Sequence, residues 1–512
     1  MIIIEDINDS ANEQRQQSKY CLIYATQFTP THHPLGMGHI AAELKKAGIR
    51  YNFYTIIANG NPELDEWVRD QEFDAYLFSI YDWNILTTKR IIEKIRKYHR
   101  NKKIIVGGCA GYAYGLIFKQ LEPDFIVVGE GEEPIIKLID AIENNKEVNT
   151  VPSIAYKRND EIILNKEHAT QDINKLASPY IYDVFNKRYY KQSNSYMFTR
   201  GCIFKCTYCL WGSPKSAGTF RVKDVNLALS ELKILWHNGV REIKSQDAIF
   251  NFSTEYLKNI EENLSKRGIK FRWADADCRA DFIDEEQVRI MKKLGVIEVG
   301  LGLETTNQQT QKTIKKFLDP KKVEEAVKIL RKNNIKVHIS FQIGLPGETE
   351  EDAKKTFEFV KKLNPDEAGI FHTRLQPGTE LYETMDRYDC TNKEIFGCST
   401  FSKNNNIDIK TSNSLIEEFY KNLQKISTKR TLLINNEHHP YKLTNDGGEL
   451  TLTMYLREIR EEDSLKGINE NTEDFSKIKR IVLKTSEKTN NQDIQSIIKR
   501  MWPNATVVFS DD

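Results

Sequence analysis

Three cysteines stand close together near the middle of the 512-residue chain. Cys202, Cys206 and Cys209 follow the spacing C-x3-C-x2-C. Cysteine thiolates hold iron–sulfur clusters, and a cluster of four irons normally takes four of them. Three thiolates leave one iron free to bind a small molecule through nitrogen and oxygen atoms. The spacing therefore predicts a cluster with one open coordination position.

Two simpler interpretations compete with the cluster. A structural zinc site needs four protein ligands in tetrahedral geometry, so Cys278 or a distant histidine would have to complete it. The three thiols could also be unrelated buried side chains. The residues around the cysteines favour the cluster.

The segment 200–212 resembles the signature of the radical S-adenosylmethionine (SAM) enzymes, with Gly201 before the first cysteine and Tyr208 before the last. The resemblance implies a [4Fe-4S] cluster whose open iron binds SAM and whose electron releases a 5′-deoxyadenosyl radical. It also implies an electron donor such as flavodoxin or ferredoxin. Tyr208 is expected beside the adenine of SAM; the alternative is an aromatic ring packed under the loop.

Composition limits the class of protein. Hydrophobic residues make up 39% and charged residues 29%, as in globular chains of two or three domains. Lys and Arg number 74 against 73 Asp and Glu, so net charge predicts no nucleic-acid partner. No apolar run reaches the roughly 20 residues that a membrane span needs, and the N-terminus lacks a signal-peptide layout. Eight cysteines, three of them clustered, favour a reducing cytoplasm.

Residues 1–145 alternate short apolar runs with amphipathic stretches. Strands are expected at 20–25, 74–80, 103–107 and 124–128, with helices at 36–48 and from about 132. Strands this apolar, separated by helices, predict a doubly wound parallel sheet covered on both faces. Ligands of such sheets bind beyond the carboxyl ends of the strands.

This block resembles the cobalamin-binding domain that precedes the radical SAM domain in a large subfamily. The resemblance implies that cobalamin contacts residues in four loops: Leu35, Gly36, Ser79, Tyr81, Trp83, Asn84, Gly107, Gly108, Gly129 and Glu130. The Asp-x-His-x-x-Gly motif that supplies a histidine beneath cobalt is absent, because His32, His33 and His39 lack the preceding Asp. A degenerate domain that only covers the barrel is the alternative.

A connector at 146–185 contains a predicted hairpin turning at Asn159-Asp160. In the next segment, 186–389, six strands alternate with helices, and the strands are expected at 196–199, 242–245, 270–274, 296–300, 336–341 and 369–372. This pattern suggests the partial (β/α)6 barrel of the radical SAM family. Catalytic groups are expected at the carboxyl ends of its strands.

Motifs after these strands supply candidate SAM-binding residues. The resemblance implies that Glu304 bonds SAM and that the turn carrying Gln342, Gly344, Pro346 and Gly347 lies against its adenine. Glu304 could instead be a carboxylate at a helix N-terminus, and Pro346-Gly347 an ordinary β-turn.

Two further charged residues follow barrel strands. Arg279 could pair with the SAM carboxylate. Asp247 stands where many relatives carry Gly-Gly-Glu, which makes the partner of the SAM amine less defined.

Residues 390–512 contain no family motif that we recognise. A helix at 414–427 and strands at 450–456, 480–483 and 506–509, with a polar loop at 461–477, predict a small α/β extension. It could recognise substrate, cap the barrel or extend the core.

The predicted protein is a cobalamin-dependent radical SAM enzyme that methylates an unactivated carbon of an organic or peptide substrate. In a second version the cobalamin domain is no longer used, and the radical drives a rearrangement, epimerisation or ring change. A non-catalytic iron–sulfur carrier or scaffold is the alternative of another class, although a carrier needs no SAM pocket.

Overall fold

The computed structural model describes residues 4–6, 18–26, 34–57, 62–187, 190, 194–213 and 219–388. Beyond these, it describes parts of 407–419 and the backbone of strands between 391 and 510. Within this part of the chain, no helix combines the length and the apolar character needed to cross a membrane.

The first domain is built on one eight-stranded sheet. Its five central strands run parallel in the order β3-β2-β4-β5-β6, with β1 antiparallel at one edge and the β7–β8 hairpin at the other. Their bounds are β1 Ile4–Asp6, β2 Tyr20–Thr26, β3 Tyr51–Ile57, β4 Ala75–Ser79, β5 Lys103–Gly107, β6 Phe125–Val127, β7 Ile154–Arg158 and β8 Glu161–Leu164. The predicted strands and hairpin are confirmed; β3 and β1 were not predicted.

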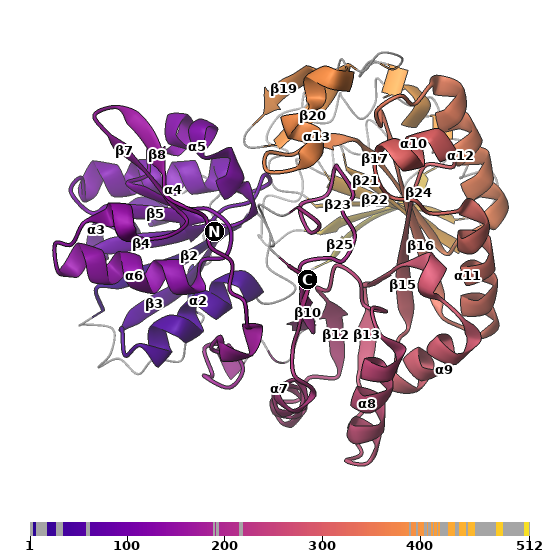
Figure 1. Ribbon diagram of the computed structural model, residues 1–512, viewed down its shortest axis with the longest axis horizontal. Helices are drawn as coiled ribbons and strands as arrows, with labels where there is room; N and C mark the ends of the chain where they lie inside the picture. The colour runs from indigo at the N-terminus through magenta and orange to yellow at the C-terminus, as the bar shows by residue number, and fades with distance from the viewer. Residues whose placement is uncertain are drawn as a thin grey trace.

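Helices cover both faces of this sheet (Figure 1). Alternate side chains of β2 enter different cores: Leu22 packs in the core of one face and Ile23 in that of the other. The first core includes residues of α2 (Leu35–Lys46) and α6 (Glu132–Glu143); the second includes residues of α3 (Pro62–Asp70), α4 (Ile85–Tyr98) and α5 (Tyr114–Leu121). Burial on both faces explains why these strands are continuous apolar runs.

The strand order also locates the ligand edge of the sheet. From β2 the chain goes first to β3 on one side and then to β4 on the other. Where the order reverses, the loops after neighbouring strands diverge and leave a crevice at the carboxyl ends. The loops after β4, β5 and β6 lie at this edge.

The second domain is a partial barrel whose six parallel strands curve without closing. The bounds of its strands are β9 Asn194–Tyr196, β12 Glu242–Ser245, β13 Arg272–Ala274 with β14 Ala276–Cys278 as the two halves of the third strand, β15 Glu298–Glu304, β16 Lys336–Ile343 and β17 Glu367–His372. Asp275, with φ of 52°, divides the third strand into β13 and β14, so the sheet falls into two parts. The third predicted strand therefore continues past its predicted end at 274.

Helices on the outer side of the barrel connect these strands (Figure 1). They are α7 Val225–His237, α8 Thr254–Ser265, α9 Glu285–Leu294, α11 Pro320–Lys332 and α12 Glu350–Leu363. Each begins after a side chain that accepts a backbone N–H of the first turn, namely Asp224, Ser253, Asp284, Asp319 or Thr349. These N-caps fix where each helix starts and so set the length of the loop before it.

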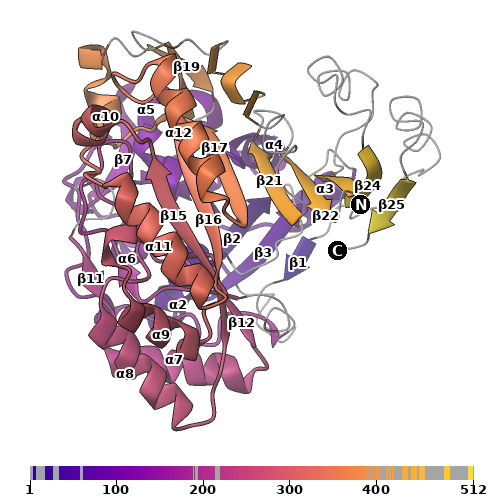
Figure 2. The same cartoon turned by 90° about the vertical axis from the view of Figure 1, so that its right-hand side faces the viewer.

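The C-terminal strands extend the barrel sheet. β21 (Lys429–Asn435) pairs parallel with β17, and β22 (Pro440–Asp446) to β25 continue outward, as Figure 2 shows. Three of them, β23 (Glu449–Tyr455), β24 (Ile478–Lys484) and β25 (Thr506–Ser510), confirm the predicted strands. The predicted helix at 414–427 is described only in part, and the predicted loop at 461–477 lies outside the described residues.

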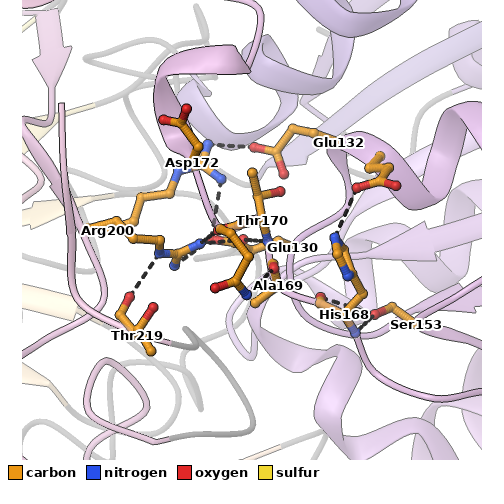
Figure 3. Close-up of polar contacts among 12 residues, drawn as sticks. Glu130, Glu132, Ser153, His168, Ala169, Thr170, Asp172, Arg200 and Thr219 are labelled. Carbon is orange, nitrogen blue, oxygen red and sulfur yellow. Dashed lines mark hydrogen bonds and ion pairs between the residues drawn. The ribbon is translucent and has the colours of Figure 1, made fainter. Parts of the chain in front are cut away.

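A buried ion-pair network joins the two domains (Figure 3). Glu130, in the loop after β6, accepts hydrogen bonds from Arg221 at 2.8 and 2.9 Å and contacts Arg200 at 3.4 Å. Arg200 also pairs with Glu132, the first residue of α6. Arg200 and Arg221 lie side by side on the antiparallel strands β10 (Thr199–Arg200) and β11 (Arg221–Val222). We call these four residues the interdomain clamp.

The side chains of the clamp residues are at most 13% exposed. Burial alone would raise the pKa of Glu132, but the charge and hydrogen bond of Arg200 lower that pKa to about 2. A buried carboxylate in this state depends on its cation.

We expect Arg200→Met to lower the free energy of unfolding by about 3–5 kcal/mol, because Glu132 loses its cation while it stays buried. Urea titration of the anaerobic protein measures the loss. Arg200→Met combined with Glu132→Met should recover part of it. The control is Lys19→Met, which breaks an exposed pair with Glu143 and should cost at most about 1 kcal/mol. Equal losses in Arg200→Met and the control would contradict a structural role for the clamp.

Candidate active site between the two domains

A cavity of about 680 Å³ lies where the carboxyl edge of the N-terminal sheet faces the mouth of the barrel. Its N-terminal wall comes from α2 and from the loops after β4, β5 and β6. Its barrel wall includes Cys209, Tyr208, Glu304 and Gln342. Candidate residues from both domains therefore meet in one space.

The three clustered cysteines lie on one short loop. The N–H of Cys209 donates to the carbonyl of Cys206 at 3.1 Å, which closes a turn between them. Besides burial, Cys202 raises the pKa of the Cys206 thiol, and Cys206 raises the pKa of the Cys209 thiol, as expected for neighbouring thiols. Cys209 faces the cavity, whereas the Cys206 thiol lies 3.9 Å from the carbonyl oxygen of Lys315 on the other side.

Burial keeps these thiols protonated unless a cation is present. It raises the pKa of Cys202 and Cys206, and it raises the pKa of Cys209 to about 12. Lys316 and Arg279 act in the opposite direction on Cys202 and Cys206. Thiolate formation here therefore needs strong positive charge, which cluster iron would supply when it displaces the protons.

The arrangement fits a cluster better than a single ion. In the part of the chain that the structure describes, no three His, Cys, Asp or Glu side chains converge closely enough to hold one metal ion. A zinc ion draws its thiolates to about 2.3 Å from one centre. A four-iron cluster instead binds each thiolate to a different iron, so its ligands stand farther apart. The assignment of the three cysteines as cluster ligands stays a prediction.

Glu304 occupies a strained position at the end of β15. Its φ is 65°, a left-handed backbone that costs energy for a residue with a side chain, and the pairing of β15 with β16 shifts by one residue there. The carboxylate is held by Lys316 at 3.2 Å and by the side-chain amide of Gln342 at 2.8 Å. These two contacts hold the strained residue in place, and its side chain lines the cavity.

Tyr208 lies beside this carboxylate. Burial, followed by the nearby Glu304 charge, raises the pKa of its hydroxyl well above the ordinary value. Tyr208, Glu304 and Gln342 all line the cavity, and their contact with SAM stays a prediction.

Asp247 and Arg279 do not line the cavity, and their contact with SAM stays a prediction. Oδ1 of Asp247 accepts two backbone N–H groups and the hydroxyl of Thr199, and Oδ2 accepts the hydroxyl of Ser245. The guanidinium of Arg279 forms two hydrogen bonds with Asp281 and stacks over Phe204 at 4.0 Å. Both side chains are engaged in fastening the barrel loops.

The turn after β16 is stabilised by a buried side chain of the same turn. Gly344 and Gly347 have φ of 90° and 78°, and neither they nor Pro346 line the cavity. Glu348 accepts the backbone N–H groups of Gly344 at 2.8 Å and Leu345 at 3.3 Å. Burial outweighs these bonds and raises the pKa of Glu348 to about 8. The sequence prediction did not include Glu348, although it directly follows the Pro-Gly turn.

Most of the predicted cobalamin residues reach the cavity. Those that line it are Gly36, Ser79, Tyr81, Gly107, Gly108, Gly129 and Glu130. The glycines allow the backbone to form the wall: a Cβ on Gly36 would point into space, 3.7 Å from the Tyr81 hydroxyl as its nearest neighbour. Gly108 is required for the fold itself, since its Cβ would lie 2.7 Å from the carbonyl of Ile80. Backbone atoms therefore form part of the N-terminal wall of the cavity.

The other predicted residues support the loops. Leu35 is buried in the core. Asn84 donates to the carbonyls of Ala25 and Ser79 and accepts the N–H of Tyr81, which fixes the loop after β4. Trp83 stacks on Tyr81 with ring centres 5.2 Å apart.

Of the three histidines considered beneath cobalt, His32 and His33 lie outside the described residues. His39 lies on α2 and lines the cavity. Burial lowers its pKa to about 3, and its Nδ1 is 3.3 Å from the carbonyl oxygen of Ala177. The ring is therefore neutral, and Nδ1–H donates to that carbonyl.

Several cavity residues carried no signal in the sequence. They come from barrel strands and short loops: Tyr112, Met197, Trp211, Ser340, Phe371, His372, Arg374 and Gln376. Arg374 pairs with Asp82 across the domains. Their roles depend on the packing of the two domains, which no local motif encodes.

Comparisons with known proteins match both domains. Family models for the radical SAM superfamily and the B12 binding domain match residues 196–360 and 22–139. A Methanocaldococcus jannaschii protein named as a methylthiotransferase is 30% identical over 329 residues, which are 61% of this chain and 70% of the relative. The anaerobic magnesium-protoporphyrin IX monomethyl ester cyclase of Rubrivivax gelatinosus is 25% identical over 326 residues, which are 59% of this chain and 56% of the cyclase.

A solved structure shares the fold. The radical SAM methyltransferase TsrM from Kitasatospora setae, with cobalamin and a [4Fe-4S] cluster bound, superposes with a TM-score of 0.61 at 16% identity. The match covers 74% of this chain and 76% of TsrM. It extends beyond either domain alone, so the two-domain architecture is shared.

We expect Cys202→Ala, Cys206→Ala and Cys209→Ala each to abolish the roughly four irons per chain that anaerobic reconstitution should give. Iron analysis and the visible absorption band measure the change. Cys21→Ala, in the core of the N-terminal sheet, should keep the full cluster. Stoichiometric zinc in protein purified without oxygen, with no iron–sulfur band, would contradict the cluster.

Glu304→Gln should weaken SAM binding about ten- to over a hundredfold, since a charged hydrogen-bond partner contributes about 1.5–3 kcal/mol. Titration of the reconstituted protein with SAM measures the affinity. Asp247→Asn is the matched comparison: it should lower stability and leave SAM affinity within about threefold, because the carboxylate bonds only to the barrel. The opposite outcome in the two variants would show that SAM lies near Asp247.

Stability should fall as pH rises through about 8, because the pKa of Glu348 is raised from 4.5 to about 8 in the folded protein. The folded state binds this proton more tightly than the unfolded state, so the stabilisation is complete below pH 4.5 and is lost above pH 8. Glu348→Gln removes this titration. Melting temperatures between pH 5 and 9 should therefore decline less in the variant; parallel curves would refute the assignment.

Proposed function

Because the chain belongs to the radical SAM superfamily and carries a B12 binding domain, we propose that it methylates an unactivated carbon of an organic or peptide substrate. It is a cobalamin-dependent radical SAM enzyme, and its cofactors are a [4Fe-4S] cluster, SAM and cobalamin.

One observation carries the proposal: a single cavity is lined by residues predicted for the cluster and SAM and by residues predicted for cobalamin. Gly36, Gly107 and Gly129 form one wall, and Cys209 and Glu304 belong to the other. Methyl transfer to a carbon radical requires the two cofactors to act on the same substrate atom, so their sites must open into one space. A protein that used only the barrel would not need glycines on the facing wall.

When bound, the cluster with SAM supplies hydrogen-atom abstraction, and cobalamin supplies the methyl group. The residues of the chain hold and orient these groups. Glu304, fixed by Lys316 and Gln342, offers a carboxylate to the SAM side of the cavity. Cys202, Cys206 and Cys209 would hold the cluster, and the glycine wall would hold the corrin face.

The substrate would lie against the barrel wall. Ser340, His372 and Gln376 give this wall polar groups, whereas Met197 and Phe371 give it apolar ones. His372 is oriented by a 2.9 Å hydrogen bond between its Nδ1 and the Ser412 hydroxyl. Such a mixed wall can position an organic or peptide substrate and exclude water from the reacting carbon.

A second candidate function is a ring-forming or rearrangement reaction. It is supported by the likeness to the Rubrivivax gelatinosus cyclase, of which the chain covers 56%. In this version the cavity and the SAM residues serve the same hydrogen abstraction, but no methyl group leaves the enzyme. A non-catalytic carrier is disfavoured, because it needs no cavity lined by Glu304 and Gln342.

Product analysis distinguishes the two reactions. Anaerobic enzyme, SAM with a deuterated methyl group and an extract of the host are incubated together. Methylation should yield S-adenosylhomocysteine and 5′-deoxyadenosine in equal amounts and a product that carries the labelled methyl. 5′-Deoxyadenosine without S-adenosylhomocysteine or label would favour the rearrangement and contradict methylation.

Gly36→Leu tests the glycine wall without disturbing the fold. The new side chain would enter the cavity, and leucine suits a helix better than glycine does. We expect the variant to lose most bound corrinoid and its S-adenosylhomocysteine formation, while some 5′-deoxyadenosine formation persists. Absorption spectra after reconstitution measure the corrinoid.

The matched control is Gly115→Leu. Gly115 is also the second residue of a helix, α5, and a Cβ there meets no atom within 4 Å. It does not line the cavity, so this variant should bind cobalamin normally. Full corrinoid content in Gly36→Leu would show that the cofactor lies elsewhere.

A further inference from the structure

The cysteine loop has a second face, away from the cavity. Residues 314–318 lie against it: the N–H of Thr207 donates to the carbonyl of Ile314 at 2.9 Å, and the Cys206 thiol lies 3.9 Å from the carbonyl of Lys315. Neither Cys202 nor Cys206 lines the cavity. The segment 314–318 therefore packs against the part of the loop that carries Cys206.

This segment exposes an aromatic side chain to solvent. Lys315 and Phe317 have φ of 54° and 52°, a left-handed backbone that is strained for both residues. Phe317 is 66% exposed, more than any other large hydrophobic side chain in the described part of the chain. Ile203, from the cysteine loop, is also exposed, at 43%. Strain that keeps an apolar ring exposed points to a contact with another molecule.

Basic side chains line the same groove as the Phe317 ring. Phe317 and Phe359 line a groove of about 630 Å³ together with Lys312, Lys321 and Lys355. Lys205, on the cysteine loop, is exposed as well.

Most of this positive charge is not neutralised. Within the described residues, Lys312, Lys321 and Lys205 form no ion pair, whereas Lys315 pairs with Glu380 and Lys355 with Glu351. The acidic residue in the groove is Asp319, whose carboxylate accepts the backbone N–H of Lys321. The groove therefore combines an apolar centre with a positive rim.

We propose that Phe317, Ile203, Lys205, Lys312 and Lys321, named here the Phe317 surface, dock an acidic one-electron carrier protein that reduces the cluster. The proposal rests on the proposed function, since only a cluster enzyme needs this electron. In the docked complex the reduced carrier would lose one electron and the cluster would gain it. Cys206, as a cluster ligand, and the backbone of Lys315 beside it would lie on the side of the cluster that faces the carrier.

The charge of the groove and its limited size both favour an electron carrier as the partner. Electron carriers form small, transient interfaces, often below about 1,200 Å², in which complementary charge speeds association. A positive rim around an exposed ring matches an acidic partner of that kind. The cavity on the other side of the loop is reserved for SAM, cobalamin and substrate, so the electron has to enter from this face.

Two variants test the surface. Phe317→Asn removes the ring, and asparagine tolerates the left-handed backbone. Lys312→Glu with Lys321→Glu reverses the rim, and glutamate in the first turn of α11 suits the helix dipole. The probe is a strongly negative flavodoxin, whose binding is measured by calorimetry. We expect each variant to weaken binding at least tenfold, and wild-type binding to weaken steeply with salt.

Reduction provides the second readout. Formation of 5′-deoxyadenosine is followed with reduced flavodoxin and, separately, with dithionite, which needs no docking. Both variants should lose most flavodoxin-driven turnover and keep dithionite-driven turnover. The control, Lys258→Glu on the exposed side of α8, should behave as wild type.

The outcomes separate the docking surface from the function. Unchanged flavodoxin binding in both variants would overturn the surface, as would a change only in self-association, which sedimentation would detect. Failure of dithionite to drive 5′-deoxyadenosine formation in the wild-type enzyme would instead contradict the proposed function.

Discussion

The interdomain clamp is the constraint on which the shared cavity depends. Glu130 and Glu132 belong to the turn between β6 and α6, whose glycines line one wall, while Arg200 immediately precedes the cysteine loop of the other. Buried ion pairs recover little net stability after desolvation, but they penalise every arrangement in which a partner is lost. The clamp therefore acts mainly on geometry: it sets the distance between the corrinoid wall and the cluster loop.

The sequence predicted features whose physical cause is local. Strands buried on both faces must be apolar along their length, so β2, β4 and β5 were visible as continuous runs. The cysteine triad was equally visible, because metal-ligand chemistry fixes both residue type and spacing. The sequence did not show which groups hold Asp247 and Arg279, because their partners are remote: Thr199 lies in β10, and the carbonyl that Arg279 contacts belongs to Lys316.

The predicted cobalamin residues divide by physical role. Gly36 and Gly107 both line the cavity; the missing side chain of Gly36 leaves space in the cavity, whereas that of Gly107 allows close packing against Val127. Asn84 instead bonds three backbone groups, and Glu130 belongs to the clamp. A motif near a ligand edge contains both the residues that face the ligand and those that hold the loop. Sequence alone does not separate them, because both follow the same strand.

One segment, 304–317, connects the SAM side of the cluster with its outer surface. At its start, Glu304 presents a carboxylate to the cavity; near its end, Lys316 turns inward to pair with that carboxylate. The residues on either side, Lys315 and Phe317, lie outward. Lys315 and Phe317 both have positive φ, so the backbone is strained on either side of the inward-facing Lys316. The strained residues Glu304, Lys315 and Phe317 thus belong to one short segment. This segment reaches both faces of the cysteine loop.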